Sequence, residues 1–145
     1  MSNEDYTENL LFLSDTHKRM LLEESRISAE VVAQRGYRTV EDAQELHELG
    51  FADYQVRPPG LLIPVRGTGS EVLFSRFRPD TPRLRKNGKP AKYEQPQGTG
   101  VILDVPPSVQ DGLRDVERRL WIGEGEKKAD SLASLGEVAI SILGV

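Results

Sequence analysis

The segment LWIGEGEKKADSL, residues 120–132, places side chains that can bind metals or phosphates where a strand passes into a helix. Glu124 follows an apolar run, and Gly125 permits a sharp bend between the two elements. A carboxylate in this position is either a metal ligand or the ordinary acidic start of a helix. Lys127 and Lys128 fall in the first helical turn, where the helix dipole disfavours cations. Either a negatively charged ligand binds nearby, or both lysines are simply solvated.

A basic segment between residues 76 and 93 is the second candidate site. Its charges are interleaved with Phe77 and Tyr93. Basic side chains neutralise phosphates and aromatic rings stack on exposed bases, so the segment suits a nucleic acid. The same charges also protect a hairpin edge from pairing with other strands, and Tyr93 can equally fill a core, so both interpretations stay open. The basic residues are Arg76, Arg78, Arg83, Arg85, Lys86, Lys89 and Lys92.

The composition excludes several classes of site. The 145 residues include no cysteine, so the chain has no disulfide framework and no thiolate zinc site. His17 and His47 are too few for a histidine metal cluster. No apolar run approaches the roughly 20 residues of a membrane helix, and the chain opens acidic where a secretory signal opens basic. We therefore expect a cytoplasmic protein that has no membrane partner.

Charge is distributed unevenly along the chain. The net charge is −4. Residues 1–57 carry 6 basic and 12 acidic side chains, residues 58–101 carry 8 and 3, and residues 102–145 carry 5 and 8. The middle of an acidic protein is therefore basic, and a local positive potential attracts phosphates even when the whole chain is negative.

Three short helices are predicted in the first 57 residues. Ser28 can cap the second helix and Gly36 can close it, while Thr39 can cap the third helix and Gly50 can end it. The predicted ranges are 15–24, 27–36 and 39–50.

From residue 58 onward the pattern changes to strands and turns. The runs LLIPVRG and EVLFSRFRPD flank GTGS as a hairpin, and Asn87-Gly88 marks a second turn. A further strand, GVILDVPP, precedes a predicted helix over residues 108–120, which Ser108 would cap. The apolar stripe of that helix would be Val109, Leu113 and Val116.

The last 26 residues predict a β-α-β unit, the connection that a parallel sheet requires. A buried strand over 120–123 is followed by a helix over 126–135, which Gly136 stops, and by an apolar strand over 138–145. Such a strand normally lies inside a sheet, so we expect it to leave an exposed apolar edge that promotes self-association.

The same residues resemble the first half of a Toprim domain, the metal-binding fold of bacterial primases, topoisomerases and some nucleases. The first motif of that family is an apolar strand, Glu-Gly, an amphipathic helix, a glycine and a second apolar strand. Glu124-Gly125 occupies the motif position.

The upstream segment resembles the region that precedes Toprim in bacterial-type primases. In that family a strand ending in Ile-Pro is followed by an arginine and then by a Lys-Tyr pair. Pro64, Arg78, Lys92 and Tyr93 match these positions, with Arg76 as an alternative arginine. ISAEVVAQRGYRTV also resembles the lead-in of primase-like proteins of plasmids, phages and integrated elements, so the resemblance spans roughly residues 27–145.

The resemblance implies an α+β architecture in three parts. These are a helical N-terminal region over 1–57, a small, mixed and basic β region with hairpins over 58–105, and an incomplete Toprim α/β unit over 106–145.

The resemblance also implies phosphoryl transfer with Mg²⁺, in which acidic residues hold the ion and the ion neutralises developing charge. Glu124 would be a metal ligand or the general base. Arg76 or Arg78, with Lys92, Lys127 and Lys128, would hold nucleotide phosphates or a single-stranded template, on which Tyr93 could stack. A helicase-type replication protein, or a missing C-terminal half, would be the protein partner.

Two departures from the family pattern matter. Primases carry an N-terminal zinc module, for which this chain has no cysteine, and Toprim chemistry needs an Asp-x-Asp motif that is absent here. Two hypotheses therefore stand: the N-terminal part of a primase-like replication protein, inactive alone, or a stand-alone module that binds nucleic acid or a replication partner without catalysis. A Toprim nuclease fragment is disfavoured, because the Arg and Lys-Tyr elements belong to the primase arrangement.

Overall fold

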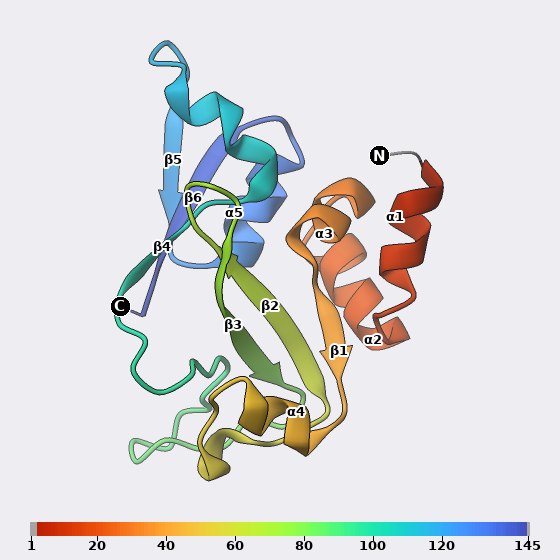
Figure 1. Cartoon of the computed structure of the whole chain (residues 1–145), viewed down its shortest axis with the longest axis vertical. Helices are drawn as coiled ribbons and strands as arrows, with labels where there is room; N and C mark the ends of the chain where they lie inside the picture. Colours follow the sequence, from red (N-terminus) through yellow and green to blue (C-terminus); the bar gives the residue numbers. More distant parts are fainter. Residues whose placement is uncertain (1–2, 145) are drawn as a thin grey trace.

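The computed structural model describes residues 3–144 as a mixed α+β protein, which confirms the predicted class. N-terminal helices lie beside a three-stranded sheet, and a second small sheet with its own helix lies at the opposite end from α4 (Figure 1). The helices are α1 (Asn3–Leu10), α2 (Asp15–Lys18), α3 (Ala29–Arg35), α4 (Ala43–Glu48) and α5 (Glu126–Ala133). The strands are β1 (Arg38–Val40), β2 (Gly60–Arg66), β3 (Val72–Pro79), β4 (Ile102–Asp104), β5 (Leu120–Gly123) and β6 (Val138–Leu143).

The first two predicted helices are present. A π-helix, η1 (Arg19–Glu24), continues α2 to the predicted end. In α3 the Ser28 side chain accepts a hydrogen bond from the backbone N–H of Val31, and Gly36 ends the helix with φ 87°, as predicted. Helix α1 was not predicted, because its sequence is almost wholly polar.

The predicted cap of the third helix is wrong. Asp42 caps α4 by accepting from the backbone N–H of Gln44, whereas Thr39 lies within β1. The Thr39 hydroxyl is used elsewhere: it accepts from the backbone N–H of Ser14 at 2.8 Å and lies 2.7 Å from Nδ1 of the buried His17.

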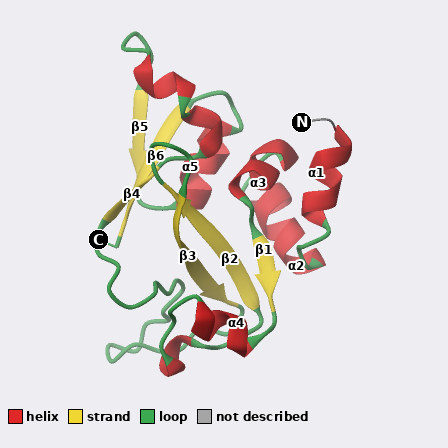
Figure 2. Ribbon diagram, viewed as in Figure 1, coloured by secondary structure: helices red, strands yellow, loops and turns green. Residues whose placement is uncertain are grey.

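The first sheet has the order β1-β2-β3 and is antiparallel throughout, which confirms the hairpin around GTGS (Figure 2). Phe77 faces the core, where it packs edge-on against Phe51. Its neighbours in β3, Arg76 and Arg78, project to the other face. After β3 the chain runs mainly as a loop, with the predicted turn at Gly88 and isolated bridges in place of a second hairpin ladder.

The second sheet has the order β4-β6-β5, and β5 and β6 are parallel, which confirms the β-α-β unit. The prediction of an exposed edge at β6 is wrong, because β4 pairs antiparallel with its other side. The edges of this sheet are β4 and β5, and β5 was expected to be buried: Leu120 is 46% exposed and Ile122 62% exposed.

The predicted helix over 108–120 is also wrong. Two short 3-10 segments, η3 (Pro107–Val109) and η4 (Asp111–Arg114), occupy its first half. Asp115 then ends helical geometry, and its carboxylate accepts from the backbone N–H of Glu117 in a local turn. Val116 is consequently exposed, although Val109 and Leu113 do pack on β6.

A buried ionic network joins α3 to the second sheet. The guanidinium of Arg35 is fully buried between the carboxylates of Asp104 and Asp130. Its Nη2 donates to Asp104 at 2.9 Å and to Asp130 at 2.8 Å, and its Nε donates to Asp130 at 3.0 Å. The Tyr37 hydroxyl donates to Asp130 at 2.6 Å. The network therefore fixes the β4-β6-β5 unit against the N-terminal helices.

Candidate functional site

A cavity of about 630 Å³ opens where β5 passes into α5. Its walls come from segments far apart in the sequence: the end of η1, strand β3, the loop at Tyr93 and the first turns of α5. The lining includes five of the predicted site residues, namely Arg76, Tyr93, Glu124, Lys127 and Lys128.

Glu124 lies at the mouth of this cavity. Its side chain is 82% exposed, and its nearest charged partner is Lys128, with Nζ 4.0 Å from the carboxylate. Gly125 caps α5 with φ −161°, an extended conformation that any residue adopts, and a Cβ there would meet no atom within 4 Å. The bend that Gly125 was predicted to permit therefore does not require a glycine, and the Glu124 carboxylate beside it is exposed.

Glu126, which was not singled out from the sequence, forms the floor. It is 1% exposed and accepts from Nη1 of Arg76 at 3.0 and 3.2 Å. Burial raises the pKa of Glu126 above its ordinary value, although the charge of Arg76 opposes that shift. An acidic residue in a first helical turn resembles an ordinary dipole partner, so the sequence carried no signal that this carboxylate is buried.

Tyr93 serves as a platform for two arginines. The guanidinium carbon of Arg76 lies 4.8 Å from the ring centroid and that of Arg78 lies 5.8 Å away. The ring is partly buried against the N-terminal hydrophobic cluster, and burial raises the pKa of its hydroxyl. Tyr93 thus contributes to the core and to the cavity wall at once.

Arg78 and Lys92 line a neighbouring cavity of about 360 Å³ instead. Their charges still reach the first cavity: the pKa of Lys127 is lowered by burial and then by the positive charges of Arg78 and Lys92. The carboxylates of Glu24 and Glu126 oppose this shift, so negative charge partly offsets the cations around Lys127, and an anion would relieve the repulsion that remains.

The remaining basic residues of the loop divide by role. Arg83 is bound to the buried Glu94, with Nε to Oε1 at 2.6 Å, and so is structural. Arg85 lines a third cavity, of about 600 Å³, together with Arg76, Tyr93 and Glu124.

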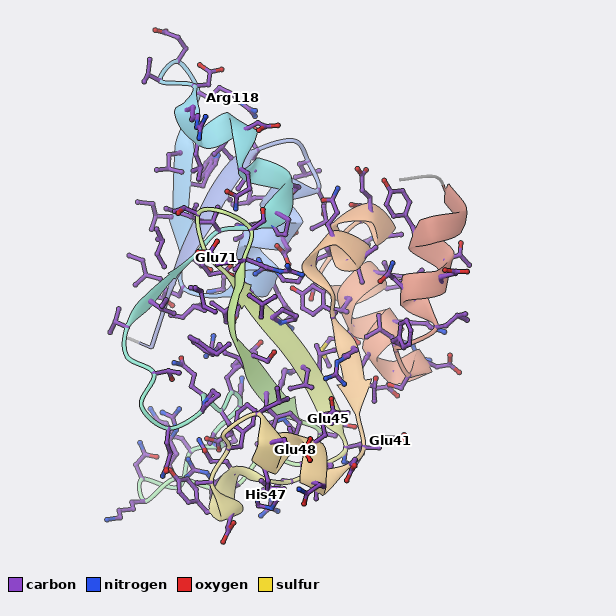
Figure 3. The ribbon with its side chains drawn as sticks, in the orientation of Figure 1. Glu41, Glu45, His47, Glu48, Glu71 and Arg118 are labelled. Carbon is purple, nitrogen blue, oxygen red and sulfur yellow. The ribbon has the colours of Figure 1, made fainter. Side chains whose placement is uncertain are left out.

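The acidic side chains of Glu41, Glu45 and Glu48 gather around α4, far from the β5–α5 junction (Figure 3).

The residues present do not complete a magnesium site. Among residues 3–144 no three His, Cys, Asp or Glu side chains come together to hold a metal. Mg²⁺ usually takes one or two carboxylates plus phosphates and waters, and Glu126 is held by Arg76. Glu124 alone is left, so no reaction step is assigned to a metal.

None of the helices described between residues 3 and 144 has both the length and the apolar character of a membrane span.

No protein-family model and no curated protein sequence matches the chain. Solved structures do match. A DnaG catalytic core superposes with a TM-score of 0.61 at 21% identity, covering 96% of this chain and 51% of that one. A DnaG primase catalytic domain bound to ssDNA superposes with a TM-score of 0.56 at 18% identity, covering 97% of this chain and 52% of that one. The RNA polymerase domain of Mycobacterium tuberculosis DnaG, in complex with double-stranded DNA, superposes with a TM-score of 0.58 at 16% identity, covering 97% of this chain and 55% of that one.

The chain therefore has the fold of part of a primase catalytic core and spans about half the length of these structures. At these identities the likeness concerns the fold.

Proposed function

We propose that this chain is part of a primase-like DNA replication protein and that it binds the phosphates of single-stranded nucleic acid or nucleotides at the Glu124 cavity. The observation that carries the proposal is the convergence of Arg76, Lys127 and Lys128 on one cavity. The Tyr93 ring lies against the guanidinium groups of Arg76 and Arg78 and so helps to hold these charges in place beside the cavity. One of the structures that share this fold is a DnaG primase catalytic domain bound to ssDNA.

Within this proposal the cavity binds and orients rather than reacts. Lys127 and Lys128 would neutralise phosphate oxygens as point charges, and Arg76 would donate to them from a fixed plane. Arg78 and Lys92 would continue the positive surface into the neighbouring cavity. We place the protein in the cytoplasm of a host that carries a mobile element, with a helicase-type replication protein as its partner.

Magnesium-dependent phosphoryl transfer is proposed only for an assembly that supplies further carboxylates. In it Glu124 would be one ligand, and the ion would stabilise the charge that develops on the transferred phosphoryl group. The competing proposal is a non-catalytic binding module. It is favoured because Glu124 is exposed and belongs to no group of three metal-binding side chains among residues 3–144.

Removing the two lysines tests the binding site. Lys127→Ala with Lys128→Ala is expected to weaken binding of a labelled oligothymidylate and to reduce the slope of log K against log salt by about 1.4, or 0.7 for each lost phosphate contact. Arg78→Ala with Lys92→Ala should reduce it similarly. Fluorescence anisotropy over a salt series measures both slopes.

The matched control is Arg114→Ala with Arg118→Ala, which removes two positive charges from the 3-10 segment and the turn that follows it. Arg114 is exposed, and Arg118 lies at the far end of the second sheet (Figure 3). If the control variant reduces the slope of log K against log salt as much as the lysine variant does, binding depends only on the net charge of the protein. The proposed site at the Glu124 cavity would then be wrong.

Magnesium is expected to leave the melting temperature of this chain unchanged at millimolar concentration, because one exposed carboxylate binds the ion too weakly to favour the folded state. Differential scanning fluorimetry with MgCl₂, and with NaCl at matched ionic strength, measures the effect. A rise specific to MgCl₂ that Glu124→Gln abolishes would establish a complete site in this chain.

A further inference from the structure

The pair formed by Arg76 and Glu126 is more deeply buried than a surface ion pair. The Arg76 side chain is 12% exposed and that of Glu126 is 1% exposed. Taking two charges out of water costs several kcal/mol per ion, on the order of what a buried pair regains. Stability alone is therefore a weak explanation for placing this pair beneath an open cavity.

Arg76 keeps hydrogen-bonding capacity in reserve. A guanidinium has five N–H donors in a fixed plane, and the contact with Glu126 is made through Nη1. The Nε of Arg76 is buried, and no residue among 3–144 offers it an acceptor. Solvent does not reach that Nε, so the donors left for a ligand in the cavity are those of Nη2, which makes no hydrogen bond with residues 3–144.

The position of Arg76 in the molecule shows where such a ligand would bind. It lies over the Tyr93 ring and lines both the 630 Å³ cavity and the 600 Å³ cavity. Glu124 and Tyr93 are the other residues that both cavities share. One guanidinium thus stands at the boundary of the two cavities, fixed on one edge by Glu126 and on one face by Tyr93.

We propose that Glu126 is a positioning residue, which holds Nη1 of Arg76 so that the remaining donors of the guanidinium meet a phosphate oxygen in the Glu124 cavity. The inference rests on the proposed function, because it takes phosphate as the ligand. It adds that a carboxylate is required for anion binding although its own charge opposes the anion.

This opposition of charge gives a test by sign. If Glu126 acted only through its charge, neutralising it would strengthen anion binding, because unlike charges attract and like charges repel. If Glu126 positions Arg76, the isosteric Glu126→Gln must weaken binding, because the guanidinium loses its charge-assisted anchor.

The experiment measures the Kd of the full chain for a labelled oligothymidylate with Glu126→Gln, Arg76→Gln and the double variant. Each single variant is expected to raise Kd roughly tenfold, the loss of about one charge-assisted hydrogen bond. The double variant should raise Kd no further, since the two residues act as one unit. Glu117→Gln, which neutralises an exposed carboxylate outside the cavity, should leave binding unchanged.

Tighter binding by Glu126→Gln, or additive losses in the double variant, would overturn the positioning role. Should Glu126→Gln fail to fold, Arg76→Lys decides: it keeps the charge and loses the planar donors, so a wild-type Kd in that variant would overturn the inference. If Lys127→Ala with Lys128→Ala binds the oligothymidylate as tightly as the wild type does, the proposed function is contradicted instead. Failure of the proposed function is thus distinguished from failure of the positioning role.

Discussion

Replacing Arg35 with alanine is expected to lower the free energy of unfolding by about 3–5 kcal/mol, because it leaves two carboxylates buried without their partner. Both Asp104 and Asp130 are 0% exposed. The loss should appear as a shift of the midpoint in urea unfolding monitored by circular dichroism.

Arg38→Ala is the matched control. Arg38 also pairs with a carboxylate, that of Glu45, but the two side chains are 39% and 33% exposed. Pairs of this kind contribute about 0–1 kcal/mol. Equal losses for Arg35→Ala and Arg38→Ala would mean that burial does not decide the strength of the Arg35 network.

This network also marks a limit of sequence reasoning. Arg35 is 69 residues from Asp104 and 95 residues from Asp130, so no local spacing connects them. The one signal available was the position of Arg35 near the end of a helix whose neighbouring residues, Val31 and Val32, are apolar and buried. A charge on that face needs a buried partner, but the sequence does not say which carboxylate supplies it.

Local signals succeeded where the cap and its partner are close in sequence. Ser28 and Gly36 bound α3 as predicted, because each acts within one turn of the helix. Thr39 failed as a cap because a residue 22 positions away, His17, engages its hydroxyl. The Thr39 hydroxyl, which the local pattern assigned to the start of the helix, makes a tertiary contact with His17 instead.

Sheet pairing was predictable only where the strands are sequential. The β2–β3 hairpin and the β5–β6 parallel pair followed from turn residues and from the intervening helix. The antiparallel pairing of β4 with β6 is a long-range contact, and it converted the predicted edge into the central strand. Leu120, Trp121 and Ile122 of β5 consequently stay exposed at one edge of the sheet.

The candidate site was predicted in outline. Glu124, Lys127 and Lys128 were recognised from their position at a strand–helix junction, and the structure brings Arg76 and Tyr93 to them. Arg78 and Lys92 lie one cavity further along. Glu126 escaped notice, because its burial and its pairing with Arg76 of β3 come from tertiary packing.

Phe77→Ala is expected to lower the free energy of unfolding by about 3–5 kcal/mol while leaving the charges of the site in place. Phe77 is 0% exposed and packs edge-on against Phe51 with ring centroids 5.8 Å apart. Gly60 shows how close this packing is: a Cβ on it would lie 2.4 Å from the Phe77 ring. Removing the ring leaves a cavity that neighbouring strands cannot fill without moving.

Leu84→Ala is the control, because Leu84 is 69% exposed in the loop after β3 and should change stability by no more than about 0.5 kcal/mol. The more informative comparison is with binding. Phe77 separates Arg76 from Arg78 in β3, so its ring fixes the strand that presents both guanidinium groups on the opposite face. We expect Phe77→Ala, measured where it remains folded, to weaken oligothymidylate binding although no charge has changed. Wild-type affinity in a destabilised Phe77→Ala variant would show that the arginines need only their charge, and that the rigidity of β3 contributes nothing to the site.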